Sequence, residues 1–307
     1  MKYVVSGYIG FDNFGDEAIA HILCDKLKSA GAEKITLISS NPQRTSALHK
    51  VDSCGMLNFL PALMEADMLI SGGGSLLQDV TSLKSLLYYL FVIYSALILR
   101  KKVKIYAQGI GPINSITGKI LTKFALKKVS EITVRDIKSK ELLAEWGIPS
   151  ILVKDPVFEL ELPLNNKKGV VGIQLRKYKG LDERFLENLA CEIFKFFPNN
   201  HIKLISLQDS IDLEVCEKFA KILNSKGVFN VEVLNGLSIN DVFETISGLE
   251  YLISMRFHAD VVGIKTGVKT LAINYDPKIS KLAAEYNLPM INLDEKDFSS
   301  QFEKLCE

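Results

Sequence analysis

The sequence lacks several features that assign a chain to a specialised class. It has one tryptophan and five widely spaced cysteines, with no pair at the short spacing of a zinc or redox motif. The four histidines do not complete such a motif, so we predict reduced thiols and no metal site. The amino end has the pattern of a buried strand without the features of a secretory signal, which predicts a cytoplasmic protein.

A basic excess is also missing. The chain has 37 Lys and Arg against 36 Asp and Glu, a formal net charge of +1, so we expect no nucleic-acid partner. One apolar run, residues 86–99, holds 14 residues whose only polar side chains are three tyrosines and a serine. A transmembrane helix needs about 20 residues. We therefore favour a helix buried in the core, and keep open a peripheral contact of residues 86–99 with the inner face of the cell membrane.

Short β-branched runs alternate with helical patterns along all 307 residues. This alternation predicts an α/β fold of two Rossmann-like domains, with parallel sheets facing a central cleft. Two prolines and a polar run interrupt it at 156–168, which predicts a linker between an N-terminal domain (1–155) and a C-terminal domain (169–307). Strands are expected at 3–6, 34–38, 68–71, 104–107, 131–134, 151–153, 170–175, 203–206, 231–233, 251–254 and 270–273.

Glycine-rich and polar segments follow the strands of the first half. Residues 7–17 form either a tight turn with Asp16 as helix cap or a loop whose backbone approaches a ligand. Residues 71–79 contain three consecutive glycines, and we favour an anion-binding loop over a crowded junction of strand and helix. The segment lacks the Gly-Lys-Ser/Thr of a P-loop, which disfavours nucleotide hydrolysis. Arg135 ends another strand, where it either meets a ligand or pairs with Asp136.

The most informative cluster is in the second half. Arg256 and His258 follow an apolar strand, and Lys278 follows the next strand, 20 residues beyond His258. Three cations gathered at strand ends repel one another unless an anion lies among them. A guanidinium suits a bidentate grip on carboxylate or phosphate, and a histidine can relay a proton near neutral pH.

The ordered set of segments resembles the polysaccharide pyruvyl transferase family, and looks closest to the S-layer-associated, CsaB-type members. The segments are GYIGFDNFGDEA, SGGGSLLQD, YAQGIGP, TVRD with SKELL and WG, KDPVF, VGIQLR, SMRFHAD and NYDPKISKLA. The resemblance implies a GT-B-like fold, phosphoenolpyruvate as donor, and an acceptor hexosamine, often N-acetylmannosamine, on a lipid-linked oligosaccharide of the cell wall. It also implies that Arg135, His258 and Lys278 hold the donor.

On this resemblance we expect a pyruvate ketal to form and phosphate to leave, with no cofactor because phosphoenolpyruvate is a substrate. Catalytic roles are expected for His258 as acid, for Arg135, and for a carboxylate base among Asp12, Asp16 and Asp79. Donor binding is expected to add Arg256, Gly73 and Gly74. The acceptor is expected to contact Asp12, Asn13, Asp16, Ser75 and Gln78.

Two other functions remain open at this level. A nucleotide-sugar glycosyltransferase would use the same two-domain fold, because function depends on the site and not on the fold. A non-catalytic, carbohydrate-binding subunit of an assembly complex is the other alternative. The set of Arg256, His258 and Lys278 favours pyruvyl transfer over both.

Overall fold

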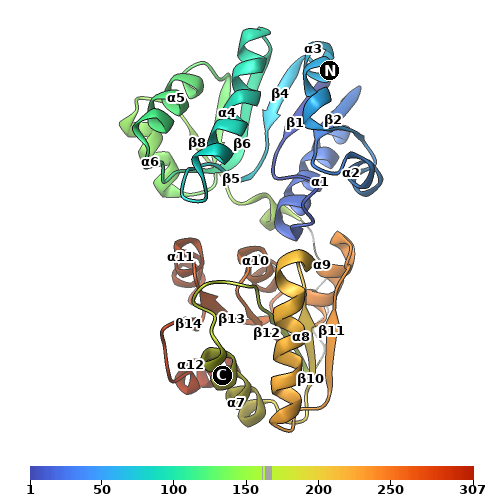
Figure 1. The fold of residues 1–307 in the computed structure, drawn as a ribbon, viewed down its shortest axis with the longest axis vertical. Coiled ribbons are helices and arrows are strands. Elements are labelled where there is room, and N and C mark those ends of the chain that lie inside the picture. The colour runs from blue at the N-terminus through green and yellow to red at the C-terminus, as the bar shows by residue number, and fades with distance from the viewer. Residues whose placement is uncertain (161, 163–167) are drawn as a thin grey trace. The chain divides into compact units, whose positions relative to one another are not determined.

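The computed structural model describes residues 1–160, 162 and 168–307. It divides into two compact units, Met1–Leu160 and Glu161–Glu307, each built on its own parallel sheet (Figure 1). Residues 161 and 163–167 of the linker predicted at 156–168 lie outside the described residues, and its beginning, Pro156–Glu159, is a 3-10 helix, η2.

The first unit has its strands in the order β3-β2-β1-β4-β6-β7-β8, with β5 paired to β6, and every pairing is parallel. One group of helices, α3 to α6, contributes to the larger apolar core, and α1 packs in a second cluster with β1 and β2. The elements are β1 (Lys2–Ser6), α1 (Phe14–Ser29), β2 (Lys34–Ile38), α2 (Pro42–His49), β3 (Asp52–Cys54), η1 (Met56–Asn58), α3 (Phe59–Glu65), β4 (Met68–Ser71), β5 (Gly74–Leu77), α4 (Leu83–Ile98), β6 (Lys102–Ile110), α5 (Ile116–Leu126), β7 (Glu131–Val134), α6 (Ile137–Glu145) and β8 (Ile151–Leu152).

The second unit repeats this design with the strand order β11-β10-β9-β12-β13-β14, again all parallel. In both units the order reverses beside the first strand, as in Rossmann folds, so ligands are expected at the carboxyl ends of the central strands. The elements are β9 (Val170–Gln174), α7 (Glu183–Phe196), β10 (His201–Ile205), α8 (Asp209–Ser225), β11 (Val231–Leu234), α9 (Ile239–Ser247), β12 (Tyr251–Ser254), α10 (Phe257–Lys265), β13 (Lys269–Asn274), α11 (Pro277–Tyr286), β14 (Met290–Asn292) and α12 (Ser299–Cys306).

The predicted α/β fold with two parallel sheets is confirmed, and each of the eleven expected strands corresponds to an observed one. Three further strands were missed. Two of them, β3 and β14, are only three residues long. The third, β5, begins at Gly74 inside the segment that we expected to be a loop.

Residues 86–99 form most of α4, which begins after Ser82, whose hydroxyl accepts a hydrogen bond from the amide of Ser85. Leu86, Leu90 and Ile93 are buried in the first unit's core, as the core-helix interpretation predicted, whereas Leu87 and Phe91 are exposed. In the part of the chain that the structure describes, no helix is both long and apolar enough to cross a membrane.

Candidate active site

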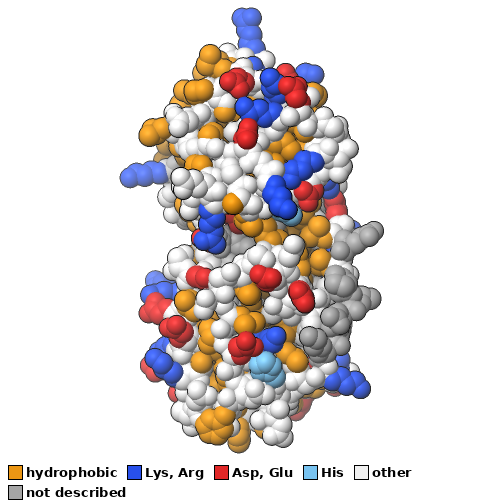
Figure 2. All heavy atoms as spheres, turned by 90° about the vertical axis from the view of Figure 1, so that its right-hand side faces the viewer, with side chains coloured by type: hydrophobic (Ala, Val, Ile, Leu, Met, Phe, Trp, Pro, Cys, Tyr) orange, Lys and Arg blue, Asp and Glu red, His pale blue; other side chains and the backbone are white. Residues whose placement is uncertain are grey.

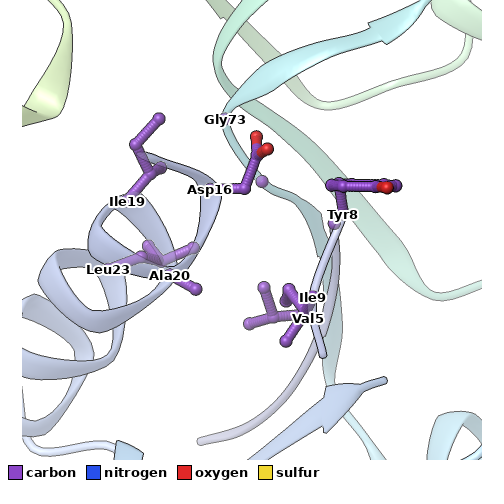
Figure 3. A pocket seen from close by; sticks show the side chains of 10 residues that line it. Val5, Tyr8, Ile9, Asp16, Ile19, Ala20, Leu23 and Gly73 are labelled. Atoms are coloured by element: carbon purple, nitrogen blue, oxygen red, sulfur yellow. The ribbon is translucent and has the colours of Figure 1, made fainter. Parts of the chain in front are cut away.

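In the first unit, the loops that follow β1, β4, β6 and β7 meet at one edge, because these strands are parallel neighbours. A small hollow, lined mainly by apolar side chains, lies where the strand order reverses, between the ends of β1 and β4 and the first turns of α1 (Figure 3). The side chain of Asp16 projects beside Gly73, and Tyr8 lies on the side of the hollow opposite α1, with its ring pointing away from Asp16. This is the position at which an open parallel sheet binds its ligand.

The loop after β1 is held by a buried carboxylate. Glu17 accepts a 2.7 Å hydrogen bond from the amide of Gly10, and its other oxygen lies 2.9 Å from Nε2 of the fully buried His49. The cap of α1 is Asn13, which accepts from the amide of Gly15, and not Asp16 as the tight-turn interpretation proposed. The carboxylate of Asp16 therefore lines the hollow from the first turn of α1.

Asp12 is engaged elsewhere. Its backbone is left-handed, with φ of 56°, and its carboxylate pairs with Nε of Arg44 at 2.9 Å. Of the carboxylates considered for the acceptor, Asp16 is the one in the hollow.

Packing accounts for the second and third of the three consecutive glycines, Gly73 and Gly74. A Cβ on Gly73 would lie 2.6 Å from Cγ2 of Ile19, and one on Gly74 would lie 2.8 Å from the carboxylate of Asp16. The amide of Gly72 donates to the carbonyl of Ser6. Close contact between β5 and α1 thus accounts for Gly73 and Gly74 without a ligand, and anion binding by this loop stays a prediction.

Two polar residues after β5 support the backbone. The Gln78 carbonyl accepts from the amides of Val80 and Thr81, and its amide donates to the Thr81 hydroxyl. Asp79 accepts from the amides of Asn114 and Ser115 at 2.7 and 2.8 Å. Hydrogen bonds from Ser115 and Asn114 lower the pKa of Asp79. The expected roles of Gln78 in acceptor binding and of Asp79 as a base do not fit these bonds.

Arg135 forms a buried ion pair, but not with Asp136. Its Nη1 lies 2.5 Å from Asp155, and its Nη2 donates to the exposed Ser75 hydroxyl at 3.2 Å. Asp136 instead caps α6 by accepting from the amide of Ser139. Asp155 holds Arg135 at the end of β7, so the guanidinium has a fixed place at this edge and Ser75 lies beside it.

In the second unit, Arg256 is neutralised by a carboxylate that the sequence analysis did not consider. Its Nε and Nη2 each donate to Asp212 at 2.7 Å, and Nη2 also donates to Gln208 at 3.0 Å. Asp212 is fully buried, whereas Arg256 is 7% exposed. The expectation that Arg256 binds the donor is thus corrected: its anion is supplied by α8, and burial makes the pair structural.

His258 and Lys278 lie at the carboxyl ends of the neighbouring strands β12 and β13. His258 is the second residue of α10 and is partly exposed, with its ring edge-on to that of Phe257 at 5.1 Å between centroids. Lys278 is the second residue of α11, and its ammonium is 3.9 Å from Asp276 and well exposed. The predicted cations on adjacent strand ends are therefore present at this edge.

Arg176 is a further cation at the same edge, one to which the sequence analysis gave no role. It is the second residue after β9, and its amide donates to the sulfur of Met255, which precedes Arg256. Nη1 donates to the Tyr275 hydroxyl at 3.0 Å, while the buried Nε has no hydrogen-bond partner among the described residues. The signal was available, because an arginine directly follows the strand-like run VVGIQL, in which Gln174 is the single polar residue.

A buried carboxyl, that of Asp260, lies two residues after His258 in the chain. Asp260 is fully buried and accepts a 2.6 Å hydrogen bond from Ser254, and burial raises its pKa well above the usual value. Among residues 1–160, 162 and 168–307, no group of three or more His, Cys, Asp or Glu side chains comes together as a metal would require.

Comparison with solved structures defines the class of fold. Anabaena Alr3699/HepE in complex with UDP and glucose has a TM-score of 0.65 at 12% identity, over 100% of this chain and 89% of that one. A glycosyltransferase from Rickettsia africae has a TM-score of 0.64 at 11% identity (99% and 88%). UDP-GlcNAc 2-epimerase from Neisseria meningitidis bound to UDP-GlcNAc has a TM-score of 0.61 at 11% identity (100% and 91%). At such identities the likeness concerns the fold, which is GT-B-like.

The sequence itself is more specific than the fold. Residues 13–277 match the family described as polysaccharide pyruvyl transferase, and the chain belongs to that family. No curated protein sequence matches the chain. The family match spans both units and includes Arg135, Arg176 and His258, whereas Lys278 lies one residue beyond its end.

Proposed function

We propose that the protein transfers the pyruvyl group of phosphoenolpyruvate to a hexosamine of a lipid-linked cell-wall polysaccharide precursor, as a pyruvate ketal, and releases phosphate. Membership of the polysaccharide pyruvyl transferase family supports a pyruvyl transferase that modifies a polysaccharide. The CsaB-type motifs suggest N-acetylmannosamine as the acceptor and a secondary cell wall polymer that anchors an S-layer. The proposed location is the cytoplasm, at the inner face of the cell membrane.

One observation carries the choice of donor. Arg176, His258 and Lys278 follow the strands β9, β12 and β13, which are consecutive in the sheet, and Asp212 cancels the charge of Arg256. Phosphoenolpyruvate has a carboxylate and a phosphate on a three-carbon skeleton, so it matches a compact group of cations. We assign the bidentate grip to Arg176, whose planar guanidinium suits either anionic group, and a point charge to Lys278.

The proposed reaction begins with proton transfer from His258 to the methylene carbon, C3, which leaves an oxocarbenium centre at C2. One acceptor hydroxyl adds to C2 and gives up its proton. The bond between C2 and the phosphate oxygen then breaks, and a second hydroxyl adds to C2 and closes the ketal. Of the two hydroxyl protons, one restores His258 and the other leaves with phosphate, so the atoms balance. General acid catalysis of this kind contributes about 10²–10⁴-fold to rate.

For the acceptor we propose the hollow of the first unit. Asp16 lines it with the backbone of Gly7, Gly72 and Gly73, and a carboxylate there can accept hydrogen bonds from sugar hydroxyls. Asp16 is our candidate for the base that takes the first hydroxyl proton and passes it to the phosphate that leaves. Ser75, which receives a hydrogen bond from Arg135, is exposed at the same sheet edge and offers a further polar contact.

The test measures phosphate release from phosphoenolpyruvate with and without an N-acetylmannosaminyl lipid-diphosphate analogue, and weighs the sugar product. We expect acceptor-dependent release and a mass gain equal to one pyruvyl group. Thermal shifts with phosphoenolpyruvate and with a panel of UDP-sugars form the second arm. Stabilisation by a UDP-sugar and not by phosphoenolpyruvate would overturn the proposal and favour nucleotide-sugar transfer.

A further inference from the structure

Two helices of the first unit present apolar stripes to solvent. On α4, Leu87, Phe91 and Ile98 are exposed, and on α5 the stripe is Ile116, Ile120 and Phe124. The spacings of four and seven residues put each set on one side of its helix. Ile98 and Ile116 are exposed by 79% and 76%, so these side chains are not covered by the rest of their own unit. We call this surface the α4–α5 face.

The two stripes are continuous. The Tyr94 hydroxyl of α4 donates to the Leu121 carbonyl of α5 at 2.8 Å, and the rings of Tyr94 and Phe124 stack at 6.5 Å. On the other side of α4, the ring of Phe91 meets Phe59 of α3 at 5.7 Å. Hydrophobic side chains gather along the upper left margin of Figure 2. Large contiguous apolar patches of this kind mark interaction sites.

The charge around this face is of one sign. Residues 80–130 contain nine Lys and Arg and not one Asp or Glu, although the whole chain has a formal charge of only +1. The rest of the chain therefore carries a formal charge of −8. Lys104 pairs with Glu131 just beyond the segment, and the other eight cations have no carboxylate partner among the described residues. Lys119, Lys123 and Lys127 alternate with the apolar stripe of α5.

We propose that the α4–α5 face docks on a bilayer that contains anionic lipids. Apolar side chains interleaved with lysines suit the boundary of headgroups and acyl chains, where the rings and isoleucines leave water and the ammonium groups meet lipid phosphates. A second protein would need carboxylates that match the lysines as well as an apolar surface. An anionic bilayer offers negatively charged headgroups and apolar acyl chains over its whole surface. Charge complementarity thus selects the membrane as the occupant. The inference does not depend on which reaction the protein catalyses.

The test is sedimentation of the full chain with vesicles of phosphatidylglycerol and phosphatidylcholine in equal parts, against vesicles of phosphatidylcholine alone. We expect binding to the anionic vesicles that weakens with added salt. The paired variant Lys119→Glu with Lys127→Glu is expected to lower the partition coefficient at least about tenfold, because each lysine near an anionic surface contributes on that order. Ile98→Gln with Ile120→Gln, which keeps the charge, is expected to weaken binding at every salt concentration.

The matched control is Phe229→Gln with Lys221→Glu, an exposed aromatic residue and an exposed lysine of the second unit, which should leave binding unchanged. Circular dichroism of each variant checks the fold. Binding that the α4–α5 variants do not alter would overturn the proposal. The proposal would also be overturned if the protein bound neither kind of vesicle and formed a dimer, detected by sedimentation velocity, that the α4–α5 variants dissociate. Neither readout uses phosphoenolpyruvate or a sugar, so failure here leaves the proposed reaction untouched, and the reverse also holds.

Discussion

Arg256 holds both oxygens of Asp212 with two 2.7 Å hydrogen bonds, and the carboxylate is fully buried. Two amides, of Leu207 and Gln208, donate to the same carboxylate at 3.1 Å. The motif that contains Arg256 suggests a ligand-binding residue. The positive charge of Arg256 is, however, already neutralised by the buried carboxylate of Asp212.

Arg256→Gln is therefore expected to lower the free energy of unfolding by about 3–5 kcal/mol, because Asp212 would be left buried without its counter-charge. Urea unfolding followed by far-UV circular dichroism measures this. The control is Arg184→Gln, an exposed arginine on α7, for which we expect little change. A variant at Arg256 that unfolds like the wild type but binds phosphoenolpyruvate poorly would restore Arg256 to the donor site.

Arg176→Gln is expected to weaken the binding of phosphoenolpyruvate. Loss of one charge-assisted interaction of about 1.5–3 kcal/mol would raise the KM for phosphoenolpyruvate by roughly 10- to 150-fold. Arg176→Lys keeps the positive charge but lacks the planar guanidinium, so its KM for phosphoenolpyruvate should lie between those of the wild type and Arg176→Gln. Steady-state kinetics at saturating acceptor measure the effect. An unchanged KM would remove Arg176 from the donor site.

His258→Gln should reduce kcat by about 10²–10⁴-fold if the imidazole delivers the proton to C3. Because the ring is partly exposed, the fold should survive, which thermal unfolding can check. His201→Gln is the matched control, since that residue is also partly exposed and pairs with Glu232 far along the sheet from the end of β12. Full activity in the His258 variant would assign the acid to another group.

Asp260 makes stability depend on pH. Burial raises its pKa well above the usual 3.8, so the folded protein keeps a proton that the unfolded chain releases. The free energy of unfolding contributed by this group is thus highest below pH 4 and falls as pH rises towards the folded pKa. Asp260→Asn removes this dependence, so its melting temperature relative to the wild type should increase with pH. A difference that stays constant between pH 4 and 8 would mean that Asp260 is ionised in the folded protein.

The fold followed from the sequence because both halves repeat a local pattern, an apolar strand and then a helix with its own cap. Asn13, Ser82 and Asp276 each stop a strand or loop and begin a helix by accepting an amide hydrogen bond. The strand β5 escaped prediction because its first residue is the last of three glycines, and its pairing with β6 depends on contacts distant in sequence.

The candidate site was less predictable, because side-chain partners cannot be read from local spacing. Asp212 lies 44 residues before Arg256, in the first turns of a helix, where an acidic residue would be expected for the helix alone. Asp155 lies 20 residues beyond Arg135, although Asp136 was the nearer choice. In each case the cation could be identified from the sequence, whereas its carboxylate partner could be identified only from the structure.

The carboxylate of Asp212 also links the carboxyl ends of the strands β9, β10 and β12 through hydrogen bonds. It accepts from the side chain of Gln174 at the end of β9, from the amides of Leu207 and Gln208 after β10, and from Arg256 after β12. The amides of Leu207 and Gln208 can exchange hydrogen with solvent only when this junction opens. Their exchange rates therefore report the integrity of the edge that carries Arg176 and His258, and any anion that joins those residues should slow exchange at two positions it never touches.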